Sequence, residues 1–274
     1  MTDKKFILDH LRLLDDVLMV FVFDENIPAV ELVLRILLQE QDLSIQCVET
    51  QKERRNLYGH SVRMDVVARD AAGRQFDLEV QREKERWMPQ RLRYYSSMTD
   101  TRMLDSGRNY GDLQDSYTIF IMEDDIGKRG QPFYCFKRWD GTREMEDGSY
   151  LFYVNGEYKG DDPIGRLMHD FRCTRAEDMY YPELSERVKY LKDHTEGRHF
   201  MSSILDEWKK EIVEETRKEN EQAMREAEQE AIEKNSREIA CRMIARGDRK
   251  EEEIAEDVGL PLEEVRKLSA QMTV

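Results

Sequence analysis

The chain has 274 residues, of which 39% are hydrophobic and 37% are charged, and its formal net charge is −15 at pH 7. This length suits one domain of ordinary size with an appendage or two small domains, and the net charge argues against a protein that coats nucleic acid by general electrostatic attraction. The segment 51–108 departs from this average, because thirteen Lys and Arg residues outnumber nine Asp and Glu residues there.

Cysteine usage and hydropathy indicate the class of protein. The four cysteines are far apart and form no CxxC pair, and with the five histidines they show no spacing typical of zinc ligands. The N-terminus lacks the layout of a signal peptide, and no stretch approaches the roughly 18 apolar residues that span a bilayer. These features predict free thiols in a soluble, cytoplasmic protein that has no membrane partner.

Short alternating runs and helical patterns succeed one another along the first two thirds of the chain. A helix is predicted over 27–39, where a Pro stands near the start of helically spaced apolar residues. A second helix is predicted over 85–104, with a break or new start at Pro89. Strands are predicted over 43–50, 61–70, 73–81, 116–122, 132–138 and 149–155. This order predicts an α/β fold with a mixed sheet flanked by helices.

The composition changes from about Phe200, where Glu, Lys, Arg and Ala dominate and no Pro or Gly occurs before Gly247. This pattern predicts a long charged helix that ends at the glycine. A solvent-exposed helix is the simpler interpretation, and a coiled coil that forms a homodimer is the alternative. The predicted organisation is therefore a domain over 1–200, a long helix over 201–246 and a helical tail over 247–274.

The tail has a helical pattern, a turn at Gly259 and a second helix that opens at Pro261. This order resembles the middle of a helix-turn-helix. Glu263 and Glu264 lie at the start of the second helix, where they would repel phosphate. Packing of the helix pair or self-association is therefore the alternative to DNA recognition.

The strand 73–81 reads as an edge or hairpin strand, yet its polar face includes Glu79 and Gln81 in a row of polar side chains. A turn at 71–73 would place Asp65 of the preceding strand directly opposite Glu79. Two carboxylates at that spacing destabilise a hairpin or force one of them to hold a proton, whereas a cation between them reverses the effect. Oxygen ligands of this kind suit Mg²⁺ or Mn²⁺.

The spacing of these residues carries a family resemblance. Asp65, thirteen intervening residues and the run Glu79-Val80-Gln81 resemble the E-x-Q variant of the PD-(D/E)XK nuclease superfamily. Within that superfamily the chain resembles the transposase and recombination-promoting nuclease family, over roughly residues 10–200. The phrases that carry this likeness are "LLDDVLMVFVFDEN", "RMDVVARDAAGRQFDLEVQRE", "RLRYYSSMTD", "YTIFIMEDD" and "IGRLMHDFRC". The resemblance implies a restriction-endonuclease-like fold and metal-dependent cleavage of DNA.

The resemblance also implies roles for individual residues. Asp65 and Glu79 would be the metal ligands, together with the main-chain carbonyl of Val80. Gln81 would stand where this superfamily usually has Lys. Because Gln carries no charge, more of the electrostatic stabilisation of the reaction would fall on the metal.

The first helix often contributes a further carboxylate in this superfamily. Glu31 is the candidate for that ligand, and Glu25 and Glu40 are the alternatives. A nuclease also needs cations that neutralise DNA phosphates. The candidates in the basic segment are Arg54, Arg55, Arg63 and Arg91, with Tyr95 one helical turn after Arg91. A plain packing role for the tyrosine is the alternative.

The sequence therefore supports three hypotheses. The first is a Mg²⁺- or Mn²⁺-dependent DNA endonuclease that acts in recombination or in mobile elements. The second is a catalytically inactive protein of nuclease fold that binds DNA or oligomerises through its helical tail. The third is an interaction protein without a nucleic-acid role. DNA cleavage that depends on Glu79 would distinguish the first from the other two.

Overall fold

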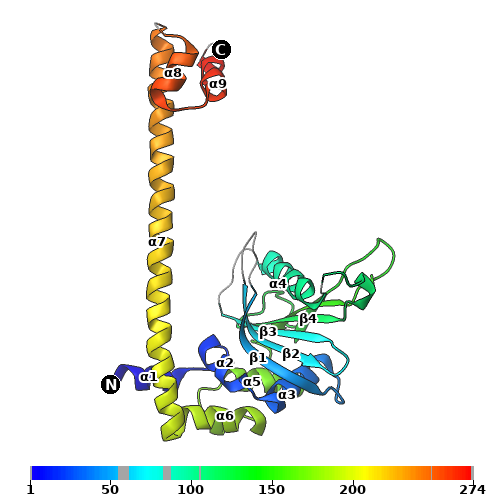
Figure 1. Ribbon diagram of the computed structural model, residues 1–274. Helices are drawn as coiled ribbons and strands as arrows, with labels where there is room; N and C mark the ends of the chain where they lie inside the picture. Colours follow the sequence, from blue (N-terminus) through cyan, green and yellow to red (C-terminus); the bar gives the residue numbers. More distant parts are fainter. Residues whose placement is uncertain (1, 55–61, 83–87, 105, 248, 273–274) are drawn as a thin grey trace. The chain divides into compact units, whose positions relative to one another are not determined.

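The structure of the protein is a computed structural model in which the described residues are 2–54, 62–82, 88–104, 106–247 and 249–272 (Figure 1). The chain divides into two compact units, Met1–Leu205 and Asp206–Val274. The first unit contains the sheet and the helices that cover it, and the second unit is helical.

A six-stranded mixed sheet forms the centre of the first unit, in the order β1-β2-β3-β4-β6-β5. β1, β2 and β3 pair antiparallel, β4 and β6 continue parallel to β3, and β5 pairs antiparallel with β6. The predicted α/β class, with a mixed sheet flanked by helices, is confirmed. The strands are β1 (Ile45–Arg54), β2 (Val62–Asp70), β3 (Gln75–Gln81), β4 (Ser116–Met122), β5 (Phe133–Phe136) and β6 (Ser149–Asn155).

The register of β2 with β3 is the one predicted from the turn. Val66 lies opposite Leu78 and Ala68 opposite Phe76, and Gly73 closes the turn with a φ of +85°, which a residue without Cβ adopts without strain. The predicted hairpin is confirmed, because β3 pairs antiparallel with β2 across this turn. The prediction of an edge position is wrong, because β4 pairs with the second edge of β3. All residues of β3 before Gln81 are buried.

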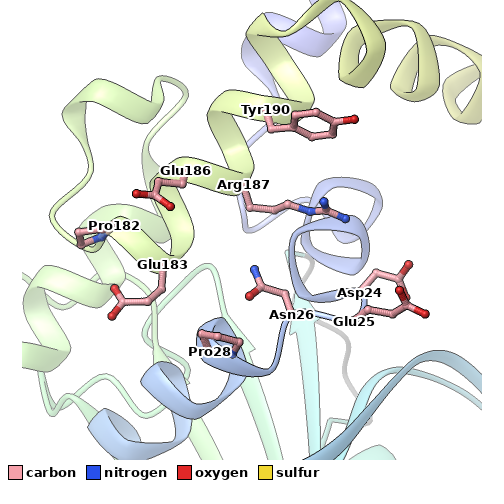
Figure 2. Close-up of a pocket in the computed structure, with 9 residues that line it drawn as sticks. All are labelled: Asp24, Glu25, Asn26, Pro28, Pro182, Glu183, Glu186, Arg187 and Tyr190. Atoms are coloured by element: carbon pink, nitrogen blue, oxygen red, sulfur yellow. The ribbon is translucent and has the colours of Figure 1, made fainter.

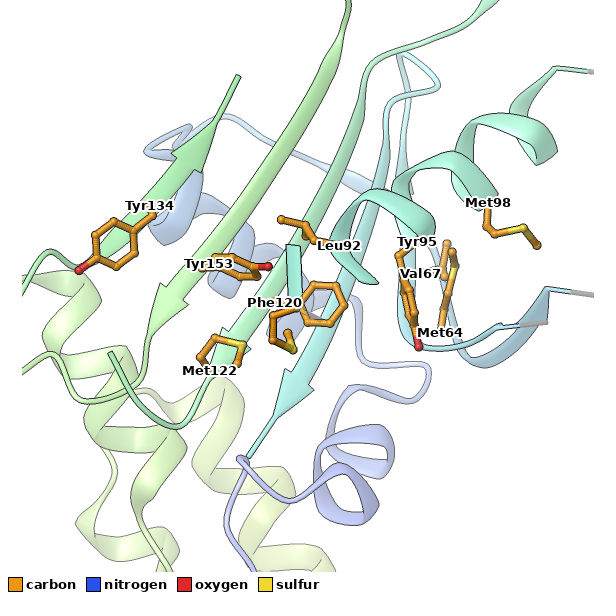
Figure 3. Close-up of a cluster of buried hydrophobic side chains, with 10 residues drawn as sticks. Met64, Val67, Leu92, Tyr95, Met98, Phe120, Met122, Tyr134 and Tyr153 are labelled. Carbon is orange, nitrogen blue, oxygen red and sulfur yellow. The ribbon is translucent and has the colours of Figure 1, made fainter. Parts of the chain in front are cut away.

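One face of the sheet packs against α4 (Met88–Met103). Figure 3 shows the aromatic and methionine side chains that fill this contact. Tyr95 of α4 meets the ring of Phe120 edge-on, with 5.4 Å between the ring centroids. Leu92 and Met98 lie in the same cluster. The helix is therefore anchored over the middle strands, which positions its polar residues relative to the end of β3.

Helices cover the opposite face of the sheet (Figure 1). α2 (Asp16–Phe23) and α3 (Ile27–Leu38) contact the first strands, and α5 (Pro163–Arg172) and α6 (Pro182–Asp193) pack against these helices. α2 is apolar almost all round, as expected of a helix enclosed by protein. α1 (Thr2–His10) precedes it. The predicted helix over 27–39 is confirmed as α3.

Lys192 is buried near the end of α6, where its ammonium group donates hydrogen bonds to the carbonyls of Leu11 and Thr174. Burial lowers the pKa of Lys192 to about 8. The folded protein therefore releases this proton at a lower pH than the unfolded chain does. The contribution of Lys192 to stability is full above the unfolded pKa of about 10.4, and it is lost as the pH falls through about 8.

We expect the free energy of unfolding of the wild type to rise, relative to that of Lys192→Met, between about pH 8 and about pH 9.5. The slope should reach up to about 1.4 kcal/mol per pH unit, the limit for one proton. Urea denaturation at several pH values measures it. Lys189→Met, at an exposed position of the same helix, should retain the wild-type slope. Parallel profiles for the wild type and Lys192→Met would contradict the prediction.

The second unit consists of the later part of α7 (Thr195–Arg246), α8 (Glu251–Val258) and α9 (Leu262–Met272). Its core contains Ala240, Ile254, Leu260 and Val265, and Glu264 at the start of α9 pairs with Arg237 of α7. The predicted long helix is present, and it begins earlier than expected, at Thr195. In the described parts of the chain, no helix combines the length and apolar character needed to cross a membrane.

Candidate active site

A cavity of about 320 Å³ lies where β3 ends and contains the central residues predicted from the sequence. α4 contributes one side of it, and the segment that leads into α2 contributes another. The residues that line it are Leu14, Asp16, Asp65, Glu79, Val80, Gln81, Arg82 and Arg91. The fold therefore brings three of the four predicted metal ligands, Asp65, Glu79 and Val80, and one predicted phosphate-binding arginine to one place.

Two crossed hydrogen bonds join β2 and β3 one residue beyond the last paired position. The amide of Asp65 donates to Oε1 of Glu79 at 2.8 Å, and the amide of Val80 donates to Oδ2 of Asp65 at 3.2 Å. Each carboxylate is thus held in place by a backbone N–H of the opposite strand. Both side chains line the cavity.

The environment of Glu79 opposes its ionisation. Glu79 is buried, and this burial, together with the charges of Asp65 and Asp77, raises its pKa well above the usual range. The charge of Arg91 acts in the opposite direction. A divalent cation would offset the repulsion between the carboxylates, and their oxygens are the donors that Mg²⁺ or Mn²⁺ prefers. The residues present therefore fit a metal ion of this class.

Arg91 of α4 supplies a positive charge next to Gln81. One guanidinium nitrogen donates to Oε1 of Gln81 at 2.6 Å, and another lies 3.4 Å from the hydroxyl of Tyr95. The guanidinium also lies over the rings of Tyr95 and Phe120, at 5.3 and 5.6 Å from their centroids. These contacts hold the charge at the position where the chain has an amide in place of Lys.

Tyr95 is buried against the sheet, and this burial and the charge of Glu79 raise its pKa to about 12. Its hydroxyl is therefore neutral at physiological pH. The ring of Tyr95 packs against Phe120, as the packing alternative predicted. Its hydroxyl contacts Arg91. We regard Tyr95 as a residue that positions the arginine.

Arg82 follows the E-x-Q run but is held by other acids. Its guanidinium forms ion pairs with Asp15 at 2.7 Å and with Glu123 at 3.1 Å, and Arg12 also pairs with Glu123 at 2.8 Å. This network fastens the segment before α2 to the ends of β3 and β4. These ion pairs hold the segment before α2 in place beside the cavity.

The structure does not place Glu31 at the cavity. One oxygen of Glu31 accepts a hydrogen bond from the amide of Ile45 at 2.8 Å, and the other pairs with Arg35 at 2.9 Å. These contacts fasten α3 to the start of β1. Among the described residues, Glu31 is not part of the lining around Asp65.

The two alternatives to Glu31 also lie elsewhere. Glu40 pairs with Arg74 at 3.0 Å. Glu25 lines a separate cavity of about 690 Å³, whose lining also includes Arg187 of α6 (Figure 2). That cavity is larger than the one at Asp65, but it holds neither residue of the predicted carboxylate pair.

Asp16 is the carboxylate that sequence reasoning missed. It is the first residue of α2, is exposed, and lines the cavity together with Asp65 and Glu79. The signal was present in the phrase "LLDDVLMVFVF", where acids directly precede an apolar run, because Asp is favoured in the first turn of a helix. The position of α2 over the sheet, which no local pattern shows, decides that this acid faces the site.

The other predicted phosphate-binding residues are incompletely described. Arg54 lies in β1, opposite Val62 of β2. Arg63 lies in β2, opposite Glu53 of β1. Their side chains and the whole of Arg55 lie outside the described residues. Their role in binding nucleic acid therefore stays a prediction.

Comparison with known proteins gives a family match for part of the chain. Residues 19–139 match the family model described as PD-(D/E)XK nuclease family transposase, a shorter span than the resemblance over residues 10–200. No curated protein and no solved structure matches the chain. The mixed sheet flanked by helices is consistent with a restriction-endonuclease-like domain. This protein therefore carries, over residues 19–139, a domain of the PD-(D/E)XK nuclease family transposases.

Proposed function

We propose that the protein is a metal-dependent endonuclease that hydrolyses phosphodiester bonds of DNA in the cytoplasm, in recombination or in mobile elements. The observation that carries the proposal is the crossed contact of Asp65 and Glu79 at the end of the β2–β3 pair. Nuclease function is also what the matching family suggests. A solvated surface pair of acids would not require the burial of Glu79 beside two other carboxylates.

The proposed metal ligands are Asp65, Glu79 and the carbonyl of Val80. In an antiparallel ladder the N–H and C=O of one residue point to the same neighbouring strand, and the amide of Val80 points to Asp65. We propose Asp16 in place of Glu31 as the further acid. A Mg²⁺ or Mn²⁺ ion held there would lower the pKa of water and offset negative charge on the phosphate.

Gln81 and Arg91 would together take the two roles of the Lys that is usual in this superfamily, which are to orient the attacking water and to stabilise negative charge. The Gln81 side chain is oriented by Arg91 at 2.6 Å, so its amide group is positioned to hydrogen-bond the attacking water. The guanidinium of Arg91 would stabilise the negative charge that grows on the phosphate oxygens. Arg54, Arg55 and Arg63 would bind the phosphates on either side.

A plasmid-nicking assay tests the proposal. The purified full chain should nick supercoiled DNA with Mg²⁺ or Mn²⁺ and should lose this activity in excess chelator. Glu79→Ala should abolish the nicking, while Glu186→Ala, at an exposed position on α6, should cleave like the wild type. Equal cleavage by the wild type and Glu79→Ala would overturn the assignment of the site.

A second candidate function follows from the neutral side chain at position 81. The protein would then be an inactive nuclease-fold module that binds DNA, or forms a homodimer, through the charged helix and tail. Binding of DNA without cleavage under either divalent ion, with the wild-type chain folded, would favour this candidate over the endonuclease.

A further inference from the structure

A second cluster of metal-ligating side chains lies at the C-terminal end of α5 and takes no part in the cavity of Asp65. The Nδ1 atom of His169 lies 3.4 Å from Oδ1 of Asp170 and 3.5 Å from Sγ of Cys173. One ligand atom from each side chain lies within 4.8 Å of the other two. His169 and Cys173 are four residues apart, so one helical turn places them on the same face.

These distances match the edges of a tetrahedral zinc site. With Zn–S of about 2.3 Å and Zn–N or Zn–O of about 2.0–2.1 Å, tetrahedral angles separate sulfur from nitrogen by about 3.6 Å and nitrogen from oxygen by about 3.4 Å. The observed values of 3.5 and 3.4 Å agree with both edges. Because Sγ of Cys173 also lies 3.9 Å from Nε2, the sulfur is off the axis of the Nδ1 lone pair, and the half-exposed ring of His169 would have to turn for both side chains to bind the same ion.

Hydrogen bonding alone does not account for this arrangement. Nδ1 of His169 faces both the carboxylate of Asp170 and the sulfur of Cys173, and a ring nitrogen carries either one proton or one lone pair, so it serves one contact at a time. The sulfur also lies 3.7 Å from the carbonyl oxygen of Asp178. Asp170 is fully buried, and in the described parts of the chain its ion-pair contact is with the imidazole of His169, which is charged only when protonated, and not with a Lys or Arg.

Neighbouring groups hold two of the three side chains in position. The oxygens of Asp170 accept hydrogen bonds from the amides of Tyr180 at 2.8 Å and Tyr181 at 2.9 Å. The ring of His169 packs against the ring of Tyr180, with 4.8 Å between the centroids. Outer contacts of this kind orient metal ligands. About half of the His169 side chain is exposed, which gives an ion a path from solvent.

We propose that His169, Asp170 and Cys173 bind one thiophilic divalent cation of the Zn²⁺ class, with the fourth position open to solvent. Sulfur and imidazole ligands select such ions, whereas Mg²⁺ prefers oxygen, so this site is chemically distinct from the proposed nuclease site. The bound ion joins the end of α5 to the segment that starts α6, because Asp170 already contacts Tyr180 and Tyr181.

A catalytic cysteine is the main alternative for a thiol beside an imidazole and a carboxylate. Burial raises the pKa of the Cys173 thiol to about 11. A nucleophilic thiolate needs the opposite, a lowered pKa in an electropositive environment. The metal-free thiol is therefore neutral and a poor nucleophile, whereas a bound divalent cation deprotonates a thiol that coordinates it.

Cobalt substitution tests the proposal on the full chain. After removal of metals with a chelator, added Co²⁺ should produce a thiolate-to-cobalt charge-transfer band in the near ultraviolet that saturates at one ion per chain. Zn²⁺ should abolish the band by displacing Co²⁺. Glu79→Ala should keep it, since the proposed nuclease site has no sulfur. A wild type without this band would overturn the proposal, whatever the outcome of the nicking assay.

Variants locate the site. Cys173→Ser should lose the charge-transfer band, while Cys135→Ser, a matched change in β5, should retain it. His169→Ala should weaken Co²⁺ binding by more than the roughly 10- to 100-fold that loss of an outer partner costs, and it serves as the decisive variant if circular dichroism shows that Cys173→Ser is unfolded. An unchanged band in Cys173→Ser, or unchanged affinity in His169→Ala, would refute the assignment.

Discussion

Glu79→Gln is expected to reduce DNA cleavage about 1000-fold or more and, at the same time, to stabilise the metal-free protein. Loss of a ligand forfeits much of the several kcal/mol by which a metal stabilises the reacting phosphate, and each 1.36 kcal/mol is tenfold in rate. The stability gain follows from the site itself, where burial and the charges of Asp65 and Asp77 oppose the ionised form of Glu79. Gln keeps an oxygen that can accept the hydrogen bond from Asp65.

The stability effect has a defined pH dependence. Because the folded-state pKa of Glu79 is raised, its contribution to stability is full below the unfolded pKa of about 4.3 and is lost as the pH rises through the folded value. In chelator and at about pH 4.3, Glu79→Gln should therefore have the same free energy of unfolding as the wild type. At neutral pH it should be more stable by about 0.5–2 kcal/mol, the usual range for one stabilising substitution.

Chemical denaturation with and without Mg²⁺ measures this effect. Mg²⁺ should raise the stability of the wild type, because an ion that binds only the folded state stabilises it by mass action, and it should leave Glu79→Gln unchanged. Glu186→Gln at an exposed position is the matched control and should follow the wild type. A metal-free Glu79→Gln less stable than the wild type at neutral pH would contradict this account of the site.

Arg91→Ala is expected to lower the rate of cleavage about 100- to 1000-fold, the range for loss of one group that stabilises developing charge. Its guanidinium is fixed by Gln81, Tyr95 and Phe120, so no reorganisation is needed when the phosphate arrives. Affinity for DNA should fall much less than the rate does. Single-turnover cleavage, combined with a binding assay in chelator, separates the two quantities.

A rescue experiment tests whether Arg91→Ala loses activity because the positive charge of Arg91 is lost. Gln81→Lys alone should retain or raise activity, because Lys is the usual residue at this place in the superfamily. The double change Arg91→Ala with Gln81→Lys should recover most of the activity lost by Arg91→Ala. Arg93→Ala, at an exposed position of the same helix, is the control and should leave the rate near that of the wild type. Failure of the rescue, with the double variant folded, would show that Arg91 does more than supply charge.

The C-terminal tail resembles a helix-turn-helix in its sequence. Its helix-turn-helix pattern is present as α8 and α9, with Gly259 in the left-handed region at the turn. Within the second unit, Glu264 at the start of α9 pairs with Arg237 of α7. Glu264, one of the two acids that would repel DNA, thus joins α9 to α7, and α8 and α9 share one hydrophobic core.

The sequence by itself determined the elements and the local register. A period of two marks β2 and β3, and the short turn between them sets which residues face each other, so the Asp65–Glu79 pair followed from local patterning. The long helix and its end at Gly247 followed in the same way, from composition and a stop signal. Such features depend on residues close together in the chain, whose geometry the backbone dictates.

Only the tertiary structure decided what surrounds that pair. β3 is an inner strand because β4, which is far along the chain, pairs with its second edge, and the charge beside Gln81 comes from α4. Asp16 lines the cavity, and Glu31 does not, because of where α2 packs. The physical reason is that side chains from different elements meet through long-range packing, which no local periodicity encodes.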